Sequence, residues 1–312
     1  GLSSFALPLY QKANSLQPGI DLFMANLAAC SIFLGKIKDA RDIYLSLLEK
    51  NPHHQRNHYQ LSRLERVTDN NHIVQMKNVL KQTNLPAHRN IFVYYALAKE
   101  LEDLEQWDES FHYYKMAGDA VTTVSNYDVG KDELLIQTII DTCTPEWLAD
   151  RKASSPIDPN DKAPIFVLGL PRTGTTLTER ILASHSSVES ICETKYLESI
   201  MRTLSGIPSV EKMTPEMIEA LAPMDATSIA KGYLDAVSYL LGDKKLFIEK
   251  LPYNFLYIGF IIKAFPKAKI VRLKRNPMDS CFAIYKQPFT WAYKFSYNLD
   301  DLGRYFVAHE PA

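Results

Sequence analysis

The stretch 164-PIFVLGLPRTGTTLTERILASH-185 decides the fold of the second half of the chain. It begins with a short continuous apolar run that ends in glycine and proline, which is typical of a buried parallel strand. A glycine-rich turn and a helical segment follow directly. A strand, such a turn and a helix together surround an anion with backbone N–H groups and a helix N-terminus. The sequence therefore predicts a phosphate-binding loop here.

This loop has the spacing of a Walker A motif but lacks its lysine. Gly169 and Gly174 occupy the glycine positions and Thr176 the Ser/Thr position, whereas Thr175 stands where the lysine belongs. In nucleotide hydrolases that lysine reaches the β- and γ-phosphates. Arg172 is the only basic residue of the loop, and no apolar strand ending in aspartate provides a Walker B motif. We expect a ligand with a short 5′ phosphate chain and no metal; a P-loop kinase or nucleotide hydrolase, and a purely structural turn, are the alternatives.

Two further predicted strands also end in polar loops. The segments 245-KLFIEKLP-252 and 268-AKIVRLKRNP-277 predict strands, and 255-FLYIGFIIKAF-265 between them predicts a helix. Strands that alternate with helices indicate an α/β domain with a parallel sheet, in which ligands bind beyond the carboxyl ends of the strands. We therefore expect the glycine-rich loop, EKLP and KRNP to converge.

The first part of the chain has a helical pattern. Over residues 1–125, apolar and small residues recur at spacings of three and four. A tetratricopeptide period of 34 residues fits well from residue 21 and from residue 91, and weakly from residue 55. We predict tetratricopeptide-like helical repeats in this region, with an ordinary amphipathic bundle as the alternative. Stacked repeats of this kind usually form a binding surface, which suggests a protein partner.

A connector separates the two regions. The segment 131-KDELLIQTIIDTCTPEWLAD-150 predicts a helix, and 151-RKASSPIDPNDKAP-164 has the Pro, Ser and Asp content of a linker. We therefore place a helical connector and linker at 126–162 and the α/β domain at 163–312.

The composition excludes several classes of function. The 312-residue chain has a net charge of −1, which gives no general attraction to nucleic acid or to an anionic membrane. No apolar run approaches the roughly 18 to 20 residues of a membrane span. We expect a reduced, cytoplasmic protein without a metal site, because the four cysteines match no zinc spacing. They are Cys30, Cys143, Cys192 and Cys281.

Three segments resemble a known enzyme family. The stretch 164-PIFVLGLPRTGTTLTERILASHSSVESICETKYL-197 resembles the 5′-phosphosulfate-binding segment of sulfotransferases, and 249-EKLPYNFLYIGFIIKAFPKAKIVRLKRNP-277 is similar to their next block. The stretch 94-YYALAKELEDLEQWDESFHYY-114 resembles the helical part of bacterial tetratricopeptide-repeat sulfotransferases, which are related to the tyrosylprotein sulfotransferase group. The resemblance implies a P-loop-like domain that uses 3′-phosphoadenosine 5′-phosphosulfate (PAPS) as sulfuryl donor, without a metal.

The resemblance also implies which residues bind the donor. Arg275 matches the family arginine that binds the 3′-phosphate. The 5′-phosphosulfate would be bound by the loop residues Pro171, Arg172, Thr173, Gly174, Thr175 and Thr176.

Three catalytic residues follow from the same resemblance. Glu193 matches the glutamate that removes the proton of the acceptor hydroxyl, and His185 is a rival base. We favour a structural role for His185, because a histidine at the end of a helix interacts well with its terminal carbonyls. Lys250 matches the lysine that stabilises the leaving group, and Arg172 helps to neutralise the same charge.

The chain departs from the family pattern in two places. Ala283 stands where the family commonly has a serine that binds the 3′-phosphate, with Ser280 nearby. The chain ends at 305-YFVAHEPA-312, whereas the family continues with elements that close over the nucleotide, so we expect the domain to be C-terminally incomplete. A non-catalytic repeat scaffold with a degenerate nucleotide-binding domain is therefore a second hypothesis. The acceptor hydroxyl could belong to a protein, a carbohydrate or a small molecule.

Overall fold

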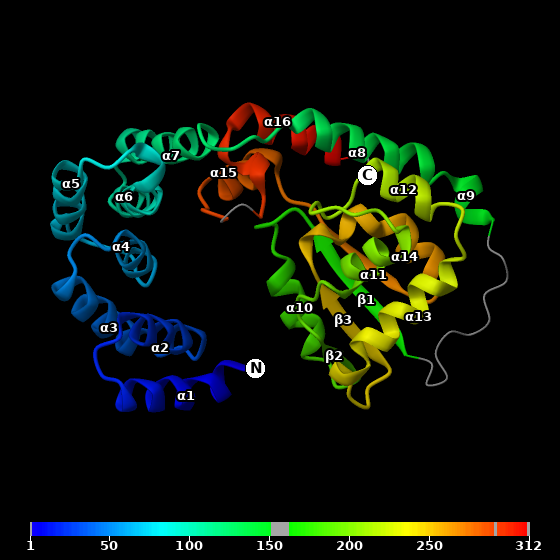
Figure 1. Ribbon diagram of the computed structural model, residues 1–312, viewed down its shortest axis with the longest axis horizontal. Coiled ribbons are helices and arrows are strands. Elements are labelled where there is room, and N and C mark those ends of the chain that lie inside the picture. Colours follow the sequence, from blue (N-terminus) through cyan, green and yellow to red (C-terminus); the bar gives the residue numbers. More distant parts are fainter. Residues whose placement is uncertain (1, 151–161, 290–291, 311–312) are drawn as a thin grey trace. The chain divides into compact units, whose positions relative to one another are not determined.

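The computed structural model describes residues 2–150, 162–289 and 292–310, which belong to two compact units (Figure 1). Unit 1 comprises Gly1–Tyr127 and Tyr285–Leu299. Unit 2 comprises Asp128–Ile284 and Asp300–Ala312.

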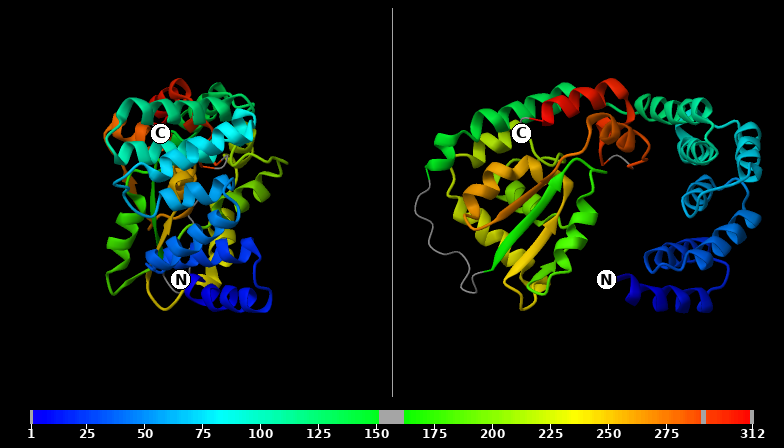
Figure 2. Two further views of the ribbon diagram at one scale, coloured as in Figure 1. Left: turned by 90° about the vertical axis from the view of Figure 1, so that its left-hand side faces the viewer. Right: turned by 180° about the vertical axis from the view of Figure 1, so that it is seen from behind.

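Unit 1 is built from helices that follow one another as packed pairs, as Figures 1 and 2 show. In the pair α2–α3, Ala28 and Ala40 are fully buried, and these small residues let the two helices approach closely beside Tyr44 and Leu47. The predicted helical N-terminal region is thus confirmed, and its tetratricopeptide type stays a prediction. The elements are α1 (Leu2–Leu16), α2 (Asp21–Phe33), α3 (Ile37–Lys50), α4 (Gln55–Ser62), α5 (Asn71–Thr83), η1 (Ala87–Arg89), α6 (Ile91–Asp103), α7 (Trp107–Thr122) and η4 (Lys294–Tyr297).

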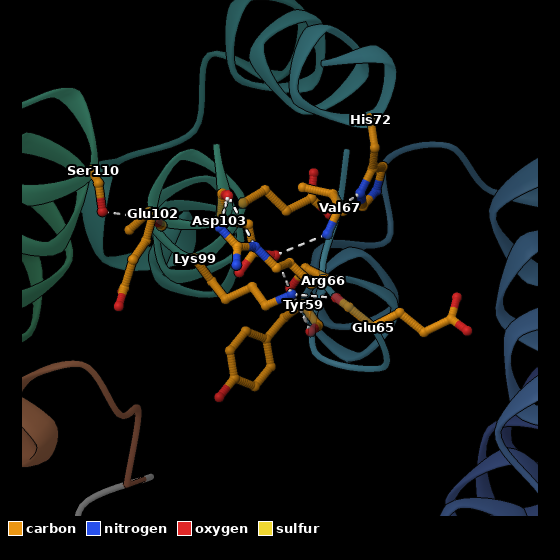
Figure 3. Close-up of polar contacts among 12 residues, drawn as sticks. Tyr59, Glu65, Arg66, Val67, His72, Lys99, Glu102, Asp103 and Ser110 are labelled. Carbon is orange, nitrogen blue, oxygen red and sulfur yellow. Dashed lines mark hydrogen bonds and ion pairs between the residues drawn. The ribbon is translucent and has the colours of Figure 1, made fainter. Parts of the chain in front are cut away.

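Polar contacts join the segment after α4 to the end of α6 (Figure 3). The Arg66 guanidinium donates to the Asp103 carbonyl oxygen at 3.1 and 3.2 Å, and the Val67 N–H donates to Asp103 Oδ2 at 3.0 Å. Lys99 Nζ donates to the Glu65 carbonyl oxygen and to Asp103 Oδ2. The Asp103 carbonyl oxygen, which the end of α6 leaves without a helical partner, is thus satisfied, as are the Glu65 carbonyl oxygen and the Val67 N–H of the segment after α4.

A buried chain of hydrogen bonds lies beside these contacts. His58 Nε2 lies 2.8 Å from the Pro52 carbonyl oxygen, which can only accept, so Nε2 carries the proton. Nδ1 of the neutral His58 ring therefore accepts from His72 Nε2, also at 2.8 Å. His72 Nδ1 lies 2.5 Å from Oε1 of the buried Glu100. Burial lowers the pKa of His58 to about 4, which keeps this ring neutral at physiological pH.

A segment from late in the sequence completes unit 1. Tyr95 OH donates to the Tyr285 carbonyl oxygen at 3.4 Å, and Lys286 forms an ion pair with Glu102 at 2.6 Å. A Cβ added to Gly118 of α7 would lie 2.4 Å from the Tyr297 carbonyl oxygen. Position 118 must therefore be glycine for this segment to pack against α7.

Unit 2 is an α/β structure around a parallel sheet with the strand order β2-β3-β1-β4. The three predicted strands and the parallel sheet are confirmed, and the short strand β2 is an addition. The strands are β1 (Ala163–Gly169), β2 (Val188–Ser190), β3 (Leu246–Lys250) and β4 (Lys269–Leu273). The helices are α8 (Val129–Thr142), α9 (Pro145–Ala149), α10 (Thr175–Ala183), α11 (Tyr196–Ser205), α12 (Pro215–Leu221), α13 (Ala226–Val237), η2 (Ser238–Leu240), η3 (Pro252–Tyr257), α14 (Ile258–Ala264), α15 (Pro277–Tyr285) and α16 (Leu299–His309).

The two faces of this sheet bury different side chains. Alternate strand residues, among them Val167 and Ile248, pack with Leu182 and Ala183 of α10 on one face. On the other face, Phe166 and Phe247 contact the ring of Tyr233 from α13. Because side chains alternate along a strand, Lys250 lies on the α10 face and Glu249 on the aromatic face.

Two predicted helices differ in detail from the observed ones. The helix expected over 131–150 is interrupted after Thr142, because Pro145 begins a new helix whose first turn is capped by the Thr144 hydroxyl. The helix expected over 255–265 starts as the 3-10 helix η3 and is α-helical only over α14. The predicted linker lies mostly outside the described residues. Within the part of the chain that the structure describes, no helix has the length and apolarity needed to cross a bilayer.

The neutral His58 ring predicts that unit 1 loses stability in acid. The unfolded chain takes up a proton near pH 6.5 and the folded chain only near pH 4, so stability falls as the pH falls through this window, by about 3 kcal/mol in all. Amide hydrogen exchange of α4 and α5, converted to opening free energies at pH 7 and pH 5, should show about 2 kcal/mol of this loss. His58→Gln should abolish it, whereas His309→Gln, which removes a similar buried histidine of unit 2, should not.

Candidate functional site

The glycine-rich loop connects the end of β1 to the start of α10. Gly169 has φ 141°, and a Cβ added to it would lie 2.6 Å from the Leu273 carbonyl oxygen of β4. Gly174, with φ 105°, is the residue before the first turn of α10. Both glycines are thus required by the backbone, and the loop presents a helix N-terminus toward the carboxyl edge of the sheet.

Arg172 has an unusual backbone in this loop. The residue is exposed and has φ 67°, a left-handed conformation that costs free energy for a residue with a side chain. Its carbonyl oxygen accepts a hydrogen bond of 3.2 Å from Arg275 Nη1, which links the loop to the segment after β4. The Thr173 hydroxyl donates to the Leu170 carbonyl oxygen at 2.7 Å, so this hydroxyl stabilises the loop itself.

Glu193 and Lys250 form an ion pair beside this loop. The pairing of β2 with β3 continues beyond β2, where the Ile191 N–H donates to the Ile248 carbonyl oxygen and the Lys250 N–H to the Cys192 carbonyl oxygen. This places Glu193 next to the end of β3, and Lys250 Nζ donates to Glu193 Oε1. The Lys250 side chain is 6% exposed and that of Glu193 is 54% exposed. The carboxylate is therefore open to solvent, while the ammonium is buried.

A second carboxylate faces the same ammonium. Glu179 Oε2, from α10, lies 3.9 Å from Lys250 Nζ, and the Glu179 side chain is buried. Its Oε1 accepts a hydrogen bond of 2.5 Å from the Ser190 hydroxyl, which in turn accepts from the Cys192 N–H at 3.0 Å. Sequence reasoning missed Glu179. The sequence could have indicated it, because Glu179 lies one helical turn after Thr175, on the helix face that packs against the sheet.

A third glutamate supports the segment around Glu193 from the opposite face. Glu249 is fully buried and accepts hydrogen bonds from the Thr194 hydroxyl, at 2.8 Å, and from Tyr233 OH. Burial raises the pKa of this carboxyl, and these donors oppose the shift. Glu249 fixes Thr194 and thereby the position of its neighbour Glu193. This role was also missed. Side-chain alternation along β3 indicates which face of the sheet Glu249 lies on, but not which residues donate hydrogen bonds to it.

Arg275 and Ser280 both follow β4, but the first is exposed and the second is buried. Arg275 is exposed and near Asp279, at 3.9 Å. Asn276 Oδ1 accepts from the N–H groups of Met278 and Asp279 and so caps α15. Ser280 is fully buried, and its hydroxyl has no hydrogen-bond partner among the described residues. Ser280 thus lies on the buried side of α15, and the half-buried Ala283 offers no hydroxyl in its place.

His185 has a structural contact, but not the predicted one with the terminal carbonyls of the helix. α10 ends at Ala183, and the exposed His185 follows it. Its Nδ1 accepts from the Ser187 N–H at 3.1 Å, so the ring stabilises the turn into β2 and does not donate to helix carbonyls.

The sheet register brings the predicted segments to one edge. Val167 lies opposite Lys250 on β3, and Gly169 lies opposite Leu273 on β4. The Arg275–Arg172 hydrogen bond and the ion pairs of Lys250 with Glu193 and Glu179 join segments at this edge. Among the described residues, no group of three or more His, Cys, Asp and Glu side chains is arranged to hold a metal ion.

The close approach of the Leu273 carbonyl oxygen to Gly169 predicts that one added methyl group strongly lowers the stability of unit 2. Gly169→Ala should destabilise unit 2 by about 2–4 kcal/mol, because the new Cβ meets the Leu273 carbonyl oxygen and φ stays positive. Gly303→Ala is the matched control, since a Cβ there meets nothing within 4 Å and should stabilise α16 slightly. Thermal unfolding of both variants measures the difference, and equal melting temperatures would contradict the prediction.

Comparisons with known proteins show similarities of the part of the chain that carries this site. Residues 164–310 match the model of the Sulfotransferase family. The chain is 33% identical over 260 residues to an uncharacterized protein of Aquifex aeolicus (strain VF5), a match that covers 82% of this chain and 34% of that protein. It is 28% identical over 123 residues to the nodulation protein NoeE of Sinorhizobium fredii (strain NBRC 101917 / NGR234), covering 36% of this chain and 28% of that protein.

The chain thus spans about a third of the length of these relatives. No solved structure shows significant similarity to it. Residues 164–310, slightly less than half of the chain, are thus similar to the Sulfotransferase family.

Proposed function

We propose that the chain transfers a sulfuryl group from PAPS to an acceptor hydroxyl. The observation that carries the proposal is the pair of Lys250 and the exposed Glu193, a cation and a candidate base in contact, at the sheet edge where the lysine-free loop ends β1. The match to the Sulfotransferase family supports sulfuryl transfer in general. The donor and the residue roles below are our inference from the geometry and from the resemblance.

The loop would hold the 5′-phosphosulfate of the donor. Gly174 leaves room for an anion to approach the backbone, because a Cβ there would meet nothing within 4 Å, and the first N–H groups of α10 would be its donors. Arg172 adds a permanent charge with a planar set of donors. PAPS has no β- and γ-phosphates, which explains why the loop functions without a lysine at position 175.

Glu193 and Lys250 would divide the chemistry between them. Glu193 accepts the proton of the acceptor hydroxyl, whose oxygen forms a new bond to sulfur. The bond from sulfur to the oxygen that bridges it to phosphorus breaks, and that oxygen leaves with the electron pair as part of adenosine 3′,5′-bisphosphate. Lys250 and Arg172 neutralise the charge that develops on this oxygen. In-line placement of the acceptor supplies most of the remaining rate enhancement.

Arg275 would bind the 3′-phosphate of the donor. It lies in the loop after β4 and touches the glycine-rich loop through the Arg172 carbonyl oxygen, so one ligand can reach both segments. Lys274 and Arg272 precede it and add positive charge. Because Ser280 is buried and Ala283 has no hydroxyl, we expect Arg275 to carry more of this contact than it would with a serine beside it.

The helical unit suggests where a protein acceptor or partner could bind. Its packed helix pairs fit a tetratricopeptide-like platform, as in the bacterial sulfotransferases that the sequence resembles. A protein, a carbohydrate and a small molecule all remain acceptors consistent with Glu193. The second candidate function is a non-catalytic scaffold, which Ala283 favours because it removes one donor to the 3′-phosphate.

Binding of adenosine 3′,5′-bisphosphate tests the donor site. Calorimetry should detect binding without Mg²⁺, and Arg275→Ala should weaken it about tenfold to hundredfold through the loss of a charge-assisted contact. Lys231→Ala is the control, because Lys231 is an exposed cation paired with Asp235 on α13. A wild-type chain that binds ATP only with Mg²⁺, and not the bisphosphate, would indicate a kinase or nucleotide hydrolase instead.

Removal of the base tests the chemistry. Glu193→Ala should lower kcat by about 10²- to 10⁴-fold, the usual contribution of a general base, and should leave adenosine 3′,5′-bisphosphate affinity nearly unchanged. The assay follows release of the bisphosphate from PAPS with a panel of phenol, sugar and peptide hydroxyls. Full activity of Glu193→Ala would exclude this base, and bisphosphate binding without turnover in the wild type would favour the scaffold.

A further inference from the structure

The buried ammonium of Lys250 lies between two carboxylates of different character. Glu193 is exposed and comes from an irregular segment, where the preceding residue Cys192 has φ 62°. Glu179 is buried and comes from the first turns of α10. Lys250 thus has one partner that solvent and ligands can reach and one that they cannot.

Several bonds hold Glu179 in a fixed position. The Ser190 hydroxyl donates to Glu179 Oε1 at 2.5 Å, and the Cys192 N–H fixes that hydroxyl in turn. α10, β2 and β3 all contribute to this arrangement, and α10 packs on both strands. The Glu179 carboxylate is therefore held by regular elements, whereas Glu193 comes from an irregular segment and its carboxylate contacts Lys250.

The charges of this cluster do not suit a purely structural role. One ammonium faces two carboxylates, which leaves an excess negative charge one helical turn from a loop that is built to attract an anion. A buried ion pair is on average no more stabilising than apolar residues of the same volume. A carboxylate that opposes donor binding and contributes little stability needs a different explanation.

We infer that Glu179 is a positioning residue that holds the Lys250 ammonium in place while Glu193 works as the base. This inference rests on the proposed function. When Glu193 takes the proton of the acceptor it becomes neutral and no longer attracts the ammonium. At that moment charge also develops on the leaving oxygen. Glu179 keeps its charge and its place, so Lys250 stays at the end of β3 and donates to that oxygen.

The test compares Glu179→Gln with the wild type. Glutamine has the same shape and still accepts from Ser190, but it removes the charge. We expect kcat for bisphosphate release from PAPS to fall about tenfold to hundredfold, as for a misplaced catalytic group. Affinity for adenosine 3′,5′-bisphosphate should stay equal or become tighter, because a negative charge is lost near the loop. If Glu179 had only a structural role, the substitution would lower kcat and the affinity for the bisphosphate together.

Glu189→Gln is the matched control. Glu189 lies on β2, accepts from the Gly242 N–H at 3.0 Å and lies 3.7 Å from Lys162, so it is a carboxylate of the same sheet without contact to Lys250. Its kcat should match that of the wild type. Ser190→Ala keeps the charge of Glu179 and loses its hydrogen bond, and should lower kcat only several-fold.

Repeating the substitution in a Lys250→Met background shows whether Glu179 acts through Lys250. Glu179→Gln should cause no further loss of kcat there, since residues that act as a unit are not additive. Equal losses in both backgrounds, or weaker bisphosphate binding by Glu179→Gln alone, would overturn the inference and leave the proposed function intact. A wild-type chain that neither binds the bisphosphate nor cleaves PAPS would overturn both.

Discussion

The pairing of β1 with a parallel strand on each side is the constraint on which the candidate site depends. β3 and β4 flank it, and the carboxyl ends of all three strands meet at one edge of the sheet. At that edge the β1 backbone comes so close to Leu273 that only glycine fits at position 169. The chain must then turn sharply into α10, with positive φ angles at Arg172 and Gly174, of which only the arginine is strained. Anion-binding geometry is thus a consequence of strand packing.

Much of this arrangement could be predicted from the sequence. Continuous apolar runs identified three of the four strands, and the rule that ligands bind at carboxyl ends brought Arg172, Lys250 and Arg275 to one edge. The short strand β2 was missed, because three residues carry too little periodicity, and it is β2 that places Glu193 beside Lys250. The buried glutamates could not be assigned either, since their partners Ser190, Thr194 and Tyr233 come from other elements and only the folded chain brings them together.

The carboxylates on the two faces of the sheet have different partners. On the α10 face, Glu179 and Glu193 share the charge of one ammonium. On the aromatic face, Glu249 has hydroxyl donors and no cation among the contacts observed, and burial raises its pKa. In the mechanism that we propose, neighbouring positions of β3 have separate roles: Lys250 neutralises the charge that develops on the leaving oxygen, and Glu249 fixes the segment that carries Glu193.

The return of residues 285–299 to unit 1 has a consequence for how the chain folds. Lys286 pairs with Glu102, and the backbone at Tyr297 lies against Gly118, so α6 and α7 receive these partners from a segment that follows all four strands. On the ribosome, unit 1 therefore stays unfinished until the whole sheet of unit 2 has been synthesised. Both units are discontinuous in sequence, so neither can be moved to another protein as one uninterrupted stretch.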